Sequence, residues 1–130
     1  MKRENIHILI IDDMDDMRML LRSFLMDDGF TNVTEASDGK KGLSLIQNSV
    51  FHLVICDWNM PEMTGIELLE QVRSEERTEA LPFLMVTGEA NPERVKEAIV
   101  KKVNDFIIKP FQPEALTKKI VDVLTSAGRL

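Results

Sequence analysis

Short apolar runs alternate with segments of helical periodicity along the whole chain. Five short runs predict strands, at residues 6–11, 32–36, 53–56, 81–87 and 105–108. The run at 53–56 contains no charged residue, which is typical of a strand buried on both faces of a parallel sheet. Between and after these runs, apolar residues recur three and four positions apart, which predicts five helices.

Boundary residues support the five predicted helices. The signals are a stop at Gly29, a turn at Asp38-Gly39, a cap at Thr64, and starts at Asn91-Pro92 and Pro113. The inner faces expected for the first, second, third and fifth helices comprise Met17, Leu20, Leu21, Phe24 and Leu25; Leu43, Ile46 and Val50; Ile66, Leu69 and Val72; and Leu116, Ile120, Val123 and Leu124.

The strict alternation of strand and helix predicts an α/β fold. Parallel strands need helical crossovers, so we expect a doubly wound five-stranded parallel sheet with helices on both faces, a three-layer sandwich. Pattern alone leaves the strand order open, and the flavodoxin-like order 2-1-3-4-5 is the natural choice for five units. In that order the first and third strands are neighbours.

Composition narrows the class of protein. The chain has 130 residues, 44% of them hydrophobic, which suits a single domain over residues 1–130 with no effector domain. Its net charge is −6 and its basic residues are scattered, so neither nucleic acid nor an anionic membrane is an expected partner. The single cysteine, Cys56, excludes a disulfide within the chain. With no signal-peptide core and no membrane-spanning run, we expect a cytoplasmic monomer.

Acidic residues follow two of the predicted strands. Asp12 and Asp13 come after the first strand, and Asp57 ends the third. Each alone is commonly a turn or cap residue, but in the expected strand order all three meet at one edge, where their charges repel. A cation would relieve that repulsion, and Mg²⁺ best suits oxygen ligands. His7 and His52 lie at strand starts, the opposite edge, so we do not expect them to bind the metal.

The fourth and fifth strands also end in polar residues. Thr87 offers a hydroxyl donor and Lys109 an ammonium group, both at the edge expected to carry the acids. Read separately, Thr87 would be a strand-end cap and Lys109 a solvated surface lysine. Taken together, the two residues predict an anion site beside Asp57.

Four motifs at the strand ends resemble those of the receiver domain of two-component response regulators. The motifs are Asp12-Asp13, Asp57-Trp58-Asn59-Met60-Pro61, Met85-Val86-Thr87-Gly88-Glu89-Ala90 and Lys109-Pro110-Phe111. The resemblance spans essentially the whole chain and is greatest to the single-domain chemotaxis regulators. It implies a phosphoprotein switch whose partner binding changes on phosphorylation, and which catalyses only its own phosphoryl transfer and dephosphorylation.

The resemblance also implies roles for the residues of these motifs. Asp57 would accept a phosphoryl group from a histidine kinase or phosphotransfer domain. Asp13, Asp57 and the backbone carbonyl of Asn59 would bind Mg²⁺, with Asp12 acting through water. Thr87 and Lys109 would bind the phosphoryl oxygens, and the Lys109–Pro110 peptide bond would be cis.

Further residues would tune the site or transmit the signal. Asn59 and Glu89 flank the acceptor and would tune the approach of water, and Gly88 would leave the phosphoryl path open. Phe106 would occupy the aromatic switch position. A downstream protein would bind the surface of the fourth helix, fifth strand and last helix, which carries Val95, Lys101, Lys102, Phe106 and Lys119.

The chain departs from the chemotaxis pattern on that output surface. Phe106 stands where tyrosine is usual, Lys101-Lys102-Val103 replaces a small segment containing glycine, and Pro92 replaces a lysine. These departures argue against a flagellar-motor partner, while a role in chemotaxis stays open.

Two other classes of protein share part of this pattern. A haloacid-dehalogenase-type phosphatase also forms an aspartyl phosphate with Mg²⁺, but its motif resembles Asp-x-Asp on the first strand, whereas Asp57-Trp58-Asn59 lies on the third. A flavodoxin-like electron carrier would need a hydroxyl-rich phosphate loop after the first strand. The acidic loop Asp12-Asp13-Met14-Asp15-Asp16 would instead repel a flavin phosphate.

Overall fold

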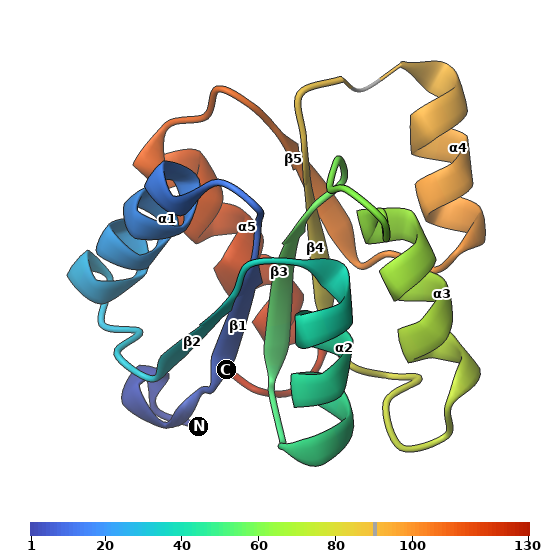
Figure 1. The fold of residues 1–130 in the computed structure, drawn as a ribbon. Coiled ribbons are helices and arrows are strands. Elements are labelled where there is room, and N and C mark those ends of the chain that lie inside the picture. Colours follow the sequence, from blue (N-terminus) through green and yellow to red (C-terminus); the bar gives the residue numbers. More distant parts are fainter. Residues whose placement is uncertain (90) are drawn as a thin grey trace.

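Five parallel strands form one sheet in the computed structural model, which describes residues 1–89 and 91–130; Ala90 of the third motif lies outside the described residues. The strands are β1 (Ile8–Ile11), β2 (Val33–Ala36), β3 (Leu53–Asp57), β4 (Phe83–Thr87) and β5 (Asp105–Ile108). Their order is β2-β1-β3-β4-β5, which confirms the predicted flavodoxin-like arrangement. Figure 1 shows β1 and β3 side by side at the centre of the molecule.

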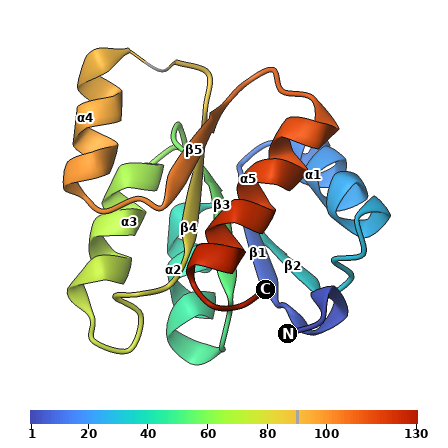
Figure 2. The ribbon, with the colours of Figure 1, turned by 180° about the vertical axis from the view of Figure 1, so that it is seen from behind.

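Helices cover both faces of the sheet, as predicted for a three-layer sandwich. The helices are α1 (Asp15–Asp27), α2 (Gly39–Asn48), α3 (Gly65–Ser74), α4 (Pro92–Val100) and α5 (Pro113–Ser126), and a short 3₁₀ turn, η1, spans Arg3–Asn5. α1 and α5 lie on one face, and α2, α3 and α4 lie on the other (Figures 1 and 2). Across residues 1–89 and 91–130, every helix is too short or too polar to traverse a bilayer.

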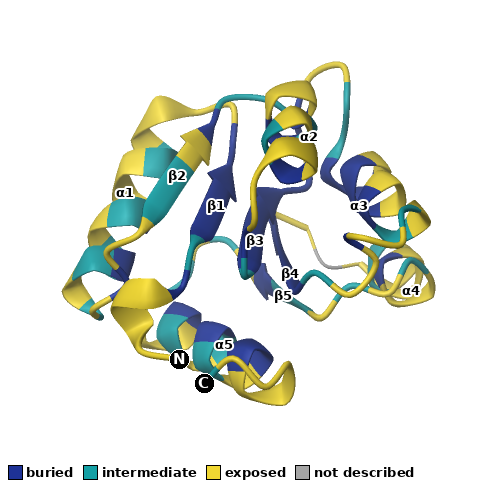
Figure 3. Ribbon diagram, turned by 90° about the horizontal axis from the view of Figure 1, so that it is seen from below, coloured by how far each residue is buried: buried dark blue, intermediate teal, exposed yellow. Residues whose placement is uncertain are grey.

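The central strands are buried on both faces because alternate side chains enter two separate cores. Leu9 and Ile11 pack in the core beneath α2, α3 and α4, whereas Ile8 and Ile10 pack in the core beneath α1 and α5. Burying each such side chain contributes about 1.5–3 kcal/mol. Figure 3 shows the burial concentrated in the strands and on the inner faces of the helices.

Helix capping fixes where two site-bearing segments begin. Thr64 and Glu67 form a reciprocal capping box at the start of α3, which confirms the cap expected at Thr64. The Asn91 side chain accepts a hydrogen bond from the Arg94 backbone N–H at 2.9 Å, and Pro92 occupies the first turn of α4. Both helices therefore start at the edge of the sheet where the strands end.

Three predicted strands start later than the apolar pattern indicates, the second by a single residue, at Val33. The first begins at Ile8, because the backbone N–H of Ile6 closes the 3₁₀ turn by bonding to the Arg3 carbonyl at 3.2 Å. The fourth begins at Phe83, because Leu81 closes a turn onto the Thr78 carbonyl at 2.9 Å and Pro82 has no N–H to donate. All three differences shorten the strand at its start and leave its end unchanged.

Two residues assigned to helix inner faces are exposed. Leu20 is 42% exposed, and Val50 is 68% exposed. α2 ends at Asn48, and Ser49 is extended with φ −142° and ψ 160°, so Val50 lies beyond the helix. The other expected inner-face residues are buried or pack against the two cores.

Arg73 joins α3 to the turn after α4. Its guanidinium donates to the carbonyl oxygens of Lys102 at 3.0 Å and Leu81 at 2.7 Å, and to Asn104 Oδ1 at 2.9 Å. Lys102 ends the α4 turn in the left-handed region with φ 66°, a conformation that favours glycine. This contact holds the C-terminal end of α4 against the rest of the fold.

Candidate functional site

The ends of β3, β4 and β5 bring the candidate site residues to one edge of the sheet. The Trp58 N–H donates to the Val86 carbonyl at 2.8 Å, and the Lys109 N–H donates to the Thr87 carbonyl at 2.8 Å. These bonds continue the strand pairing by one residue, so the backbone of each site residue is fixed by its neighbouring strand. The Lys109–Pro110 bond is cis, as the resemblance implied.

Three carboxylates meet at the switch point between β1 and β3. Asp12, Asp13 and Asp57 each place an oxygen within 4.8 Å of the other two. Lys109 Nζ lies 3.2 Å from Asp57 Oδ1 and 3.7 Å from Asp12 Oδ2. The meeting of these side chains, predicted from the strand order, is therefore found in the structure.

Burial and charge oppose one another in this acidic group. Burial raises the pKa values of Asp12 and Asp57, whose residues are only 1% and 5% exposed. The Lys109 ammonium works against that rise at Asp57, and the hydrogen bond from the Met14 N–H, at 2.9 Å, works against it at Asp12. One ammonium thus faces three carboxylates, and the site carries uncompensated negative charge.

The donor set fits a hard divalent cation. Among the described residues, the one buried side-chain oxygen or nitrogen without a hydrogen-bond partner is Asp12 Oδ2, in the same acidic group. A buried polar atom left unpaired costs about 1–3 kcal/mol. The three side chains of the group offer carboxylate oxygens, which Mg²⁺ prefers and soft metals do not.

Thr87 is buried, but its hydroxyl is turned toward the loop that follows β4. Oγ1 donates to the Glu89 carbonyl at 2.7 Å and accepts from the Glu89 N–H at 3.1 Å. A Cβ added at Gly88 would have no heavy atom within 4 Å, so this loop leaves open space beside Thr87. A larger side chain at residue 88 would therefore meet no steric obstacle near its Cβ.

Arg94 is part of the site, and sequence reasoning missed it. Nη1 donates to Thr87 Oγ1 at 3.1 Å, Nη2 donates to Asn59 Oδ1 at 3.0 Å, and the guanidinium lies 5.0 Å from the centroid of the Trp58 ring. The available signal was its position in the first turn of the helix that follows β4, because that turn starts at the site edge.

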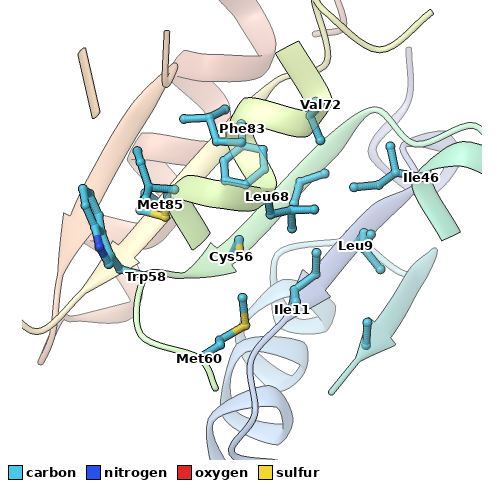
Figure 4. Packing of buried hydrophobic residues seen from close by; sticks show 14 of the residues in the cluster. Leu9, Ile11, Ile46, Cys56, Trp58, Met60, Leu68, Val72, Phe83 and Met85 are labelled. Carbon is cyan, nitrogen blue, oxygen red and sulfur yellow. The ribbon is translucent and has the colours of Figure 1, made fainter. Parts of the chain in front are cut away.

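The aromatic residues of the site lie on the side of α4. Trp58 is buried beside Met85 in the core beneath α2, α3 and α4 (Figure 4). Phe106 is half-buried against the same core, with Lys119 Nζ 5.8 Å from its ring centroid. Between Trp58, Thr87, Arg94 and Phe106 lies a cavity of only about 10 Å³.

Gly65 lets α3 approach the acceptor strand closely. Its N–H donates to the Trp58 carbonyl at 2.9 Å. A Cβ at this position would lie 2.4 Å from the Asp57 carbonyl oxygen and 2.8 Å from Met85 Sδ, closer than real contacts allow. The start of α3 and the end of β3 are therefore held together only because residue 65 has no side chain.

The remaining candidates behave as structural residues. His7 and His52 lie before β1 and β3, at the opposite edge from the acids, where the His7 N–H donates to His52 Nδ1 at 2.9 Å. Cys56 is buried, its Sγ donates to the Asp57 carbonyl at 3.2 Å, and burial raises its pKa well above the ordinary value of 9.0. The position of the two histidines agrees with the sequence interpretation.

Comparison with known sequences finds a matching family and similar proteins. A family model described as the response regulator receiver domain matches residues 8–121. Chemotaxis protein CheY of Pseudomonas aeruginosa is 46% identical over 113 residues, which cover 87% of this chain and 91% of that protein. Chemotaxis protein CheY-3 of Vibrio cholerae is 43% identical over 117 residues, which cover 90% of both chains.

Solved structures agree with the sequence relatives. Chemotaxis protein CheY4 of Vibrio cholerae matches with a TM-score of 0.86 at 35% identity, covering 92% of this chain and 98% of that chain. A CheY-like response regulator receiver domain protein of Methanospirillum hungatei matches with a TM-score of 0.87 at 30% identity, covering 95% of this chain and 97% of that chain.

Proposed function

Because the chain belongs to the response regulator receiver family, and is therefore a phospho-accepting signalling switch related to chemotaxis proteins, we propose that Asp57 is its phosphoryl acceptor. The observation that carries this proposal is the position of Asp57 at the end of β3, within an acidic group and 3.2 Å from Lys109 Nζ. The donor is a histidine kinase or a phosphotransfer domain. The phosphatase and electron-carrier alternatives have no comparable support.

Phosphoryl transfer to Asp57 requires mainly that its carboxylate is correctly positioned and that charge on the transferred oxygens is compensated. A carboxylate oxygen of Asp57 attacks the phosphorus in line, the bond from phosphorus to the donor nitrogen breaks, and that nitrogen keeps the electron pair. Lys109 is already beside the attacking carboxylate and compensates charge on the transferred oxygens. The resulting acyl phosphate is open to hydrolysis, so the modification is a timed signal.

The acidic group would hold Mg²⁺ for this reaction. Asp13, Asp57 and the Asn59 carbonyl would be ligands, with Asp12 acting through a water molecule. The ion supplies charge neutralisation at the phosphoryl oxygens. Asp12 Oδ2 is buried, has no hydrogen-bond partner in the described part of the chain and lies 3.7 Å from Lys109 Nζ; this supports a cation-dependent site over one satisfied by protein groups alone.

The remaining site residues would set the lifetime and readout of the phosphorylated state. Asn59, Gly88 and Glu89 surround the acceptor and would tune access of water. Thr87 would turn its hydroxyl to the phosphoryl group, and Phe106 would follow into the space that Thr87 leaves. A downstream protein would bind the surface formed by α4, β5 and α5 of the monomer, with its affinity changed by phosphorylation.

Phosphorylation by a small donor tests the acceptor assignment. Wild-type protein incubated with acetyl phosphate and Mg²⁺ should gain the mass of one phosphoryl group, and chelation of Mg²⁺ should prevent the gain. Asp57→Asn should gain none. Asp16→Asn is the matched control, because Asp16 is an exposed residue of the same acidic stretch outside the three-carboxylate group. Incorporation that survives in Asp57→Asn would refute the assignment.

A further inference from the structure

The hydroxyl group of Thr87 is fully engaged in hydrogen bonds away from Asp57. It donates its single proton to the Glu89 carbonyl at 2.7 Å, and it accepts from the Glu89 N–H and from Arg94 Nη1, both at 3.1 Å. A hydroxyl offers one proton and two lone pairs, so no bonding capacity is left over. Thr87 can donate to a phosphoryl oxygen only after it gives up its present donor bond and turns toward Asp57.

Arg94 opposes that turn from the side of α4. The same guanidinium bonds Thr87 Oγ1 and Asn59 Oδ1 and lies over the Trp58 ring. A planar guanidinium holds two acceptors at a fixed spacing, which a single ammonium group cannot do. One side chain on α4 therefore ties the end of β4 to the loop that follows β3.

The cavity beside Phe106 is too small for a switch movement while this contact persists. Its volume is about 10 Å³, and its walls include Thr87, Arg94 and Phe106. Such a volume holds about one water molecule and cannot admit a phenyl ring. Phe106 can turn inward only if Thr87 or Arg94 moves out of the way.

We propose that Arg94 acts as a latch, a contact that stabilises the unphosphorylated state. By bonding both Thr87 and Asn59 and forming one wall of the cavity beside Phe106, it sets how readily the protein switches on phosphorylation. This inference rests on the proposed function of Asp57. Arg94 is a positioning residue that acts through Thr87, and its release accompanies the inward turn of the Thr87 hydroxyl.

The latch makes a prediction opposite to that of simple electrostatics. Loss of a positive charge beside an anion site should weaken the binding of an anion. Loss of the latch removes a hydrogen bond made only in the resting state, so it should favour the phosphorylated-like state by about fivefold, the usual net effect of one side-chain hydrogen bond. The direction of the change therefore separates the two roles.

The experiment measures the affinity of the Mg²⁺-loaded protein for beryllofluoride, which mimics a phosphoryl group on a carboxylate. Arg94→Met keeps much of the side-chain length and removes every donor. Its control is Lys96→Met, which removes the same charge from an exposed position two residues along α4. We expect Arg94→Met to bind beryllofluoride about fivefold more tightly than wild type, and Lys96→Met to bind it equally.

A spectroscopic readout distinguishes a latch from a merely structural residue. In NMR spectra without beryllofluoride, the Thr87 methyl and Phe106 ring signals of Arg94→Met should lie part of the way toward their bound positions. Those of Lys96→Met should stay at the wild-type positions. In a Thr87→Val background, which lacks the hydroxyl, Arg94→Met should no longer tighten binding.

Each outcome decides one question. Unchanged or weaker beryllofluoride binding by Arg94→Met, with wild type binding normally, would overturn the latch. Failure of wild type itself to bind would instead overturn the proposed function. If Arg94→Met does not fold, Arg94→Lys replaces it. The lysine ammonium keeps the charge but cannot bond both Thr87 and Asn59, so we expect Arg94→Lys to bind beryllofluoride about twofold more tightly than wild type. An unchanged affinity would overturn the proposal.

Discussion

Replacing Gly65 with alanine should damage both the fold and the site. The added Cβ would lie 2.4 Å from the Asp57 carbonyl oxygen and 2.8 Å from Met85 Sδ. The carbonyl cannot withdraw, because Asp57 is paired with Val86 in the centre of the sheet. Helix α3 must therefore move away, and the hydrogen bond from the Gly65 N–H to the Trp58 carbonyl, now 2.9 Å, should lengthen or break.

The size of the effect follows from these contacts. Overpacking typically costs about 1–3 kcal/mol, and an unpaired buried backbone group costs a similar amount. We expect Gly65→Ala to lower the free energy of unfolding by about 2–4 kcal/mol. At this chain length that corresponds to a fall of roughly 10 °C in Tm. Displacement of the loop that carries Asn59 should also weaken Mg²⁺ binding.

Gly42 provides the matched control. A Cβ at Gly42 would also lie 2.4 Å from its nearest neighbour, but that neighbour is the terminal methyl of Ile11, which can rotate. Alanine inside α2 gains about 1 kcal/mol of helix propensity, which offsets the side-chain adjustment. Urea unfolding and Mg²⁺ titration of both variants test the comparison. Equal stabilities and equal Mg²⁺ affinities would refute the argument that the backbone contact at Gly65 is decisive.

The remaining predictions concern the metal, pH, the loop after β4 and the turn after α4. Mg²⁺ at a hundred times its Kd should raise the free energy of unfolding by about 2.7 kcal/mol and change Trp58 fluorescence. Asp13→Asn should abolish both effects. If millimolar Mg²⁺ changes neither the stability nor the fluorescence of wild type, the metal site is contradicted. Without metal, Asp57→Asn should be more stable than wild type at pH 8. Burial raises the pKa of Asp57 in the folded protein above the ordinary value of 3.8. A carboxyl with a raised pKa stabilises the fold while the pH is below its ordinary pKa, and this contribution is lost as the pH rises through the raised pKa. Urea titrations should show the difference shrinking toward pH 4, and a pH-independent difference would count against this reasoning. Gly88→Val should slow phosphorylation and loss of phosphate in the acetyl phosphate assay, by placing a side chain over the open loop; equal rates would remove the idea. Lys102→Gly should raise the free energy of unfolding by about 1 kcal/mol, because Lys102 has φ 66°, and unchanged thermal unfolding would exclude backbone strain there.

Strand ends were predictable because residue type marks them. A charged or hydroxyl residue after an apolar run cannot continue into the core, so Asp12, Asp57 and Thr87 locate the edge of the sheet from the sequence. Strand starts carry a weaker signal. Ile6 and Leu81 are apolar and continue the pattern, yet their backbone N–H groups close turns, and only the hydrogen bonds reveal this.

The exposed Val50 and the missed Arg94 have different physical causes. Val50 keeps the spacing of Leu43 and Ile46, but the helix ends before it, and periodicity carries no information about where hydrogen bonding stops. Arg94 is a long side chain in a helix start, which from the sequence is indistinguishable from a solvated surface charge. Its role depends on the direction in which α4 leaves the loop, a tertiary property that residue spacing does not encode.

The burial of Cys56 makes the protein convenient for site-specific labelling. It is the only cysteine in the sequence, its side chain is inaccessible, and the thiolate that reacts with maleimides is strongly disfavoured there. A cysteine introduced on the surface, for example at Lys96, would therefore be the single reactive thiol of the folded chain. Fluorophores or spin labels can be placed on α4 without first removing the native cysteine from its position next to the acceptor.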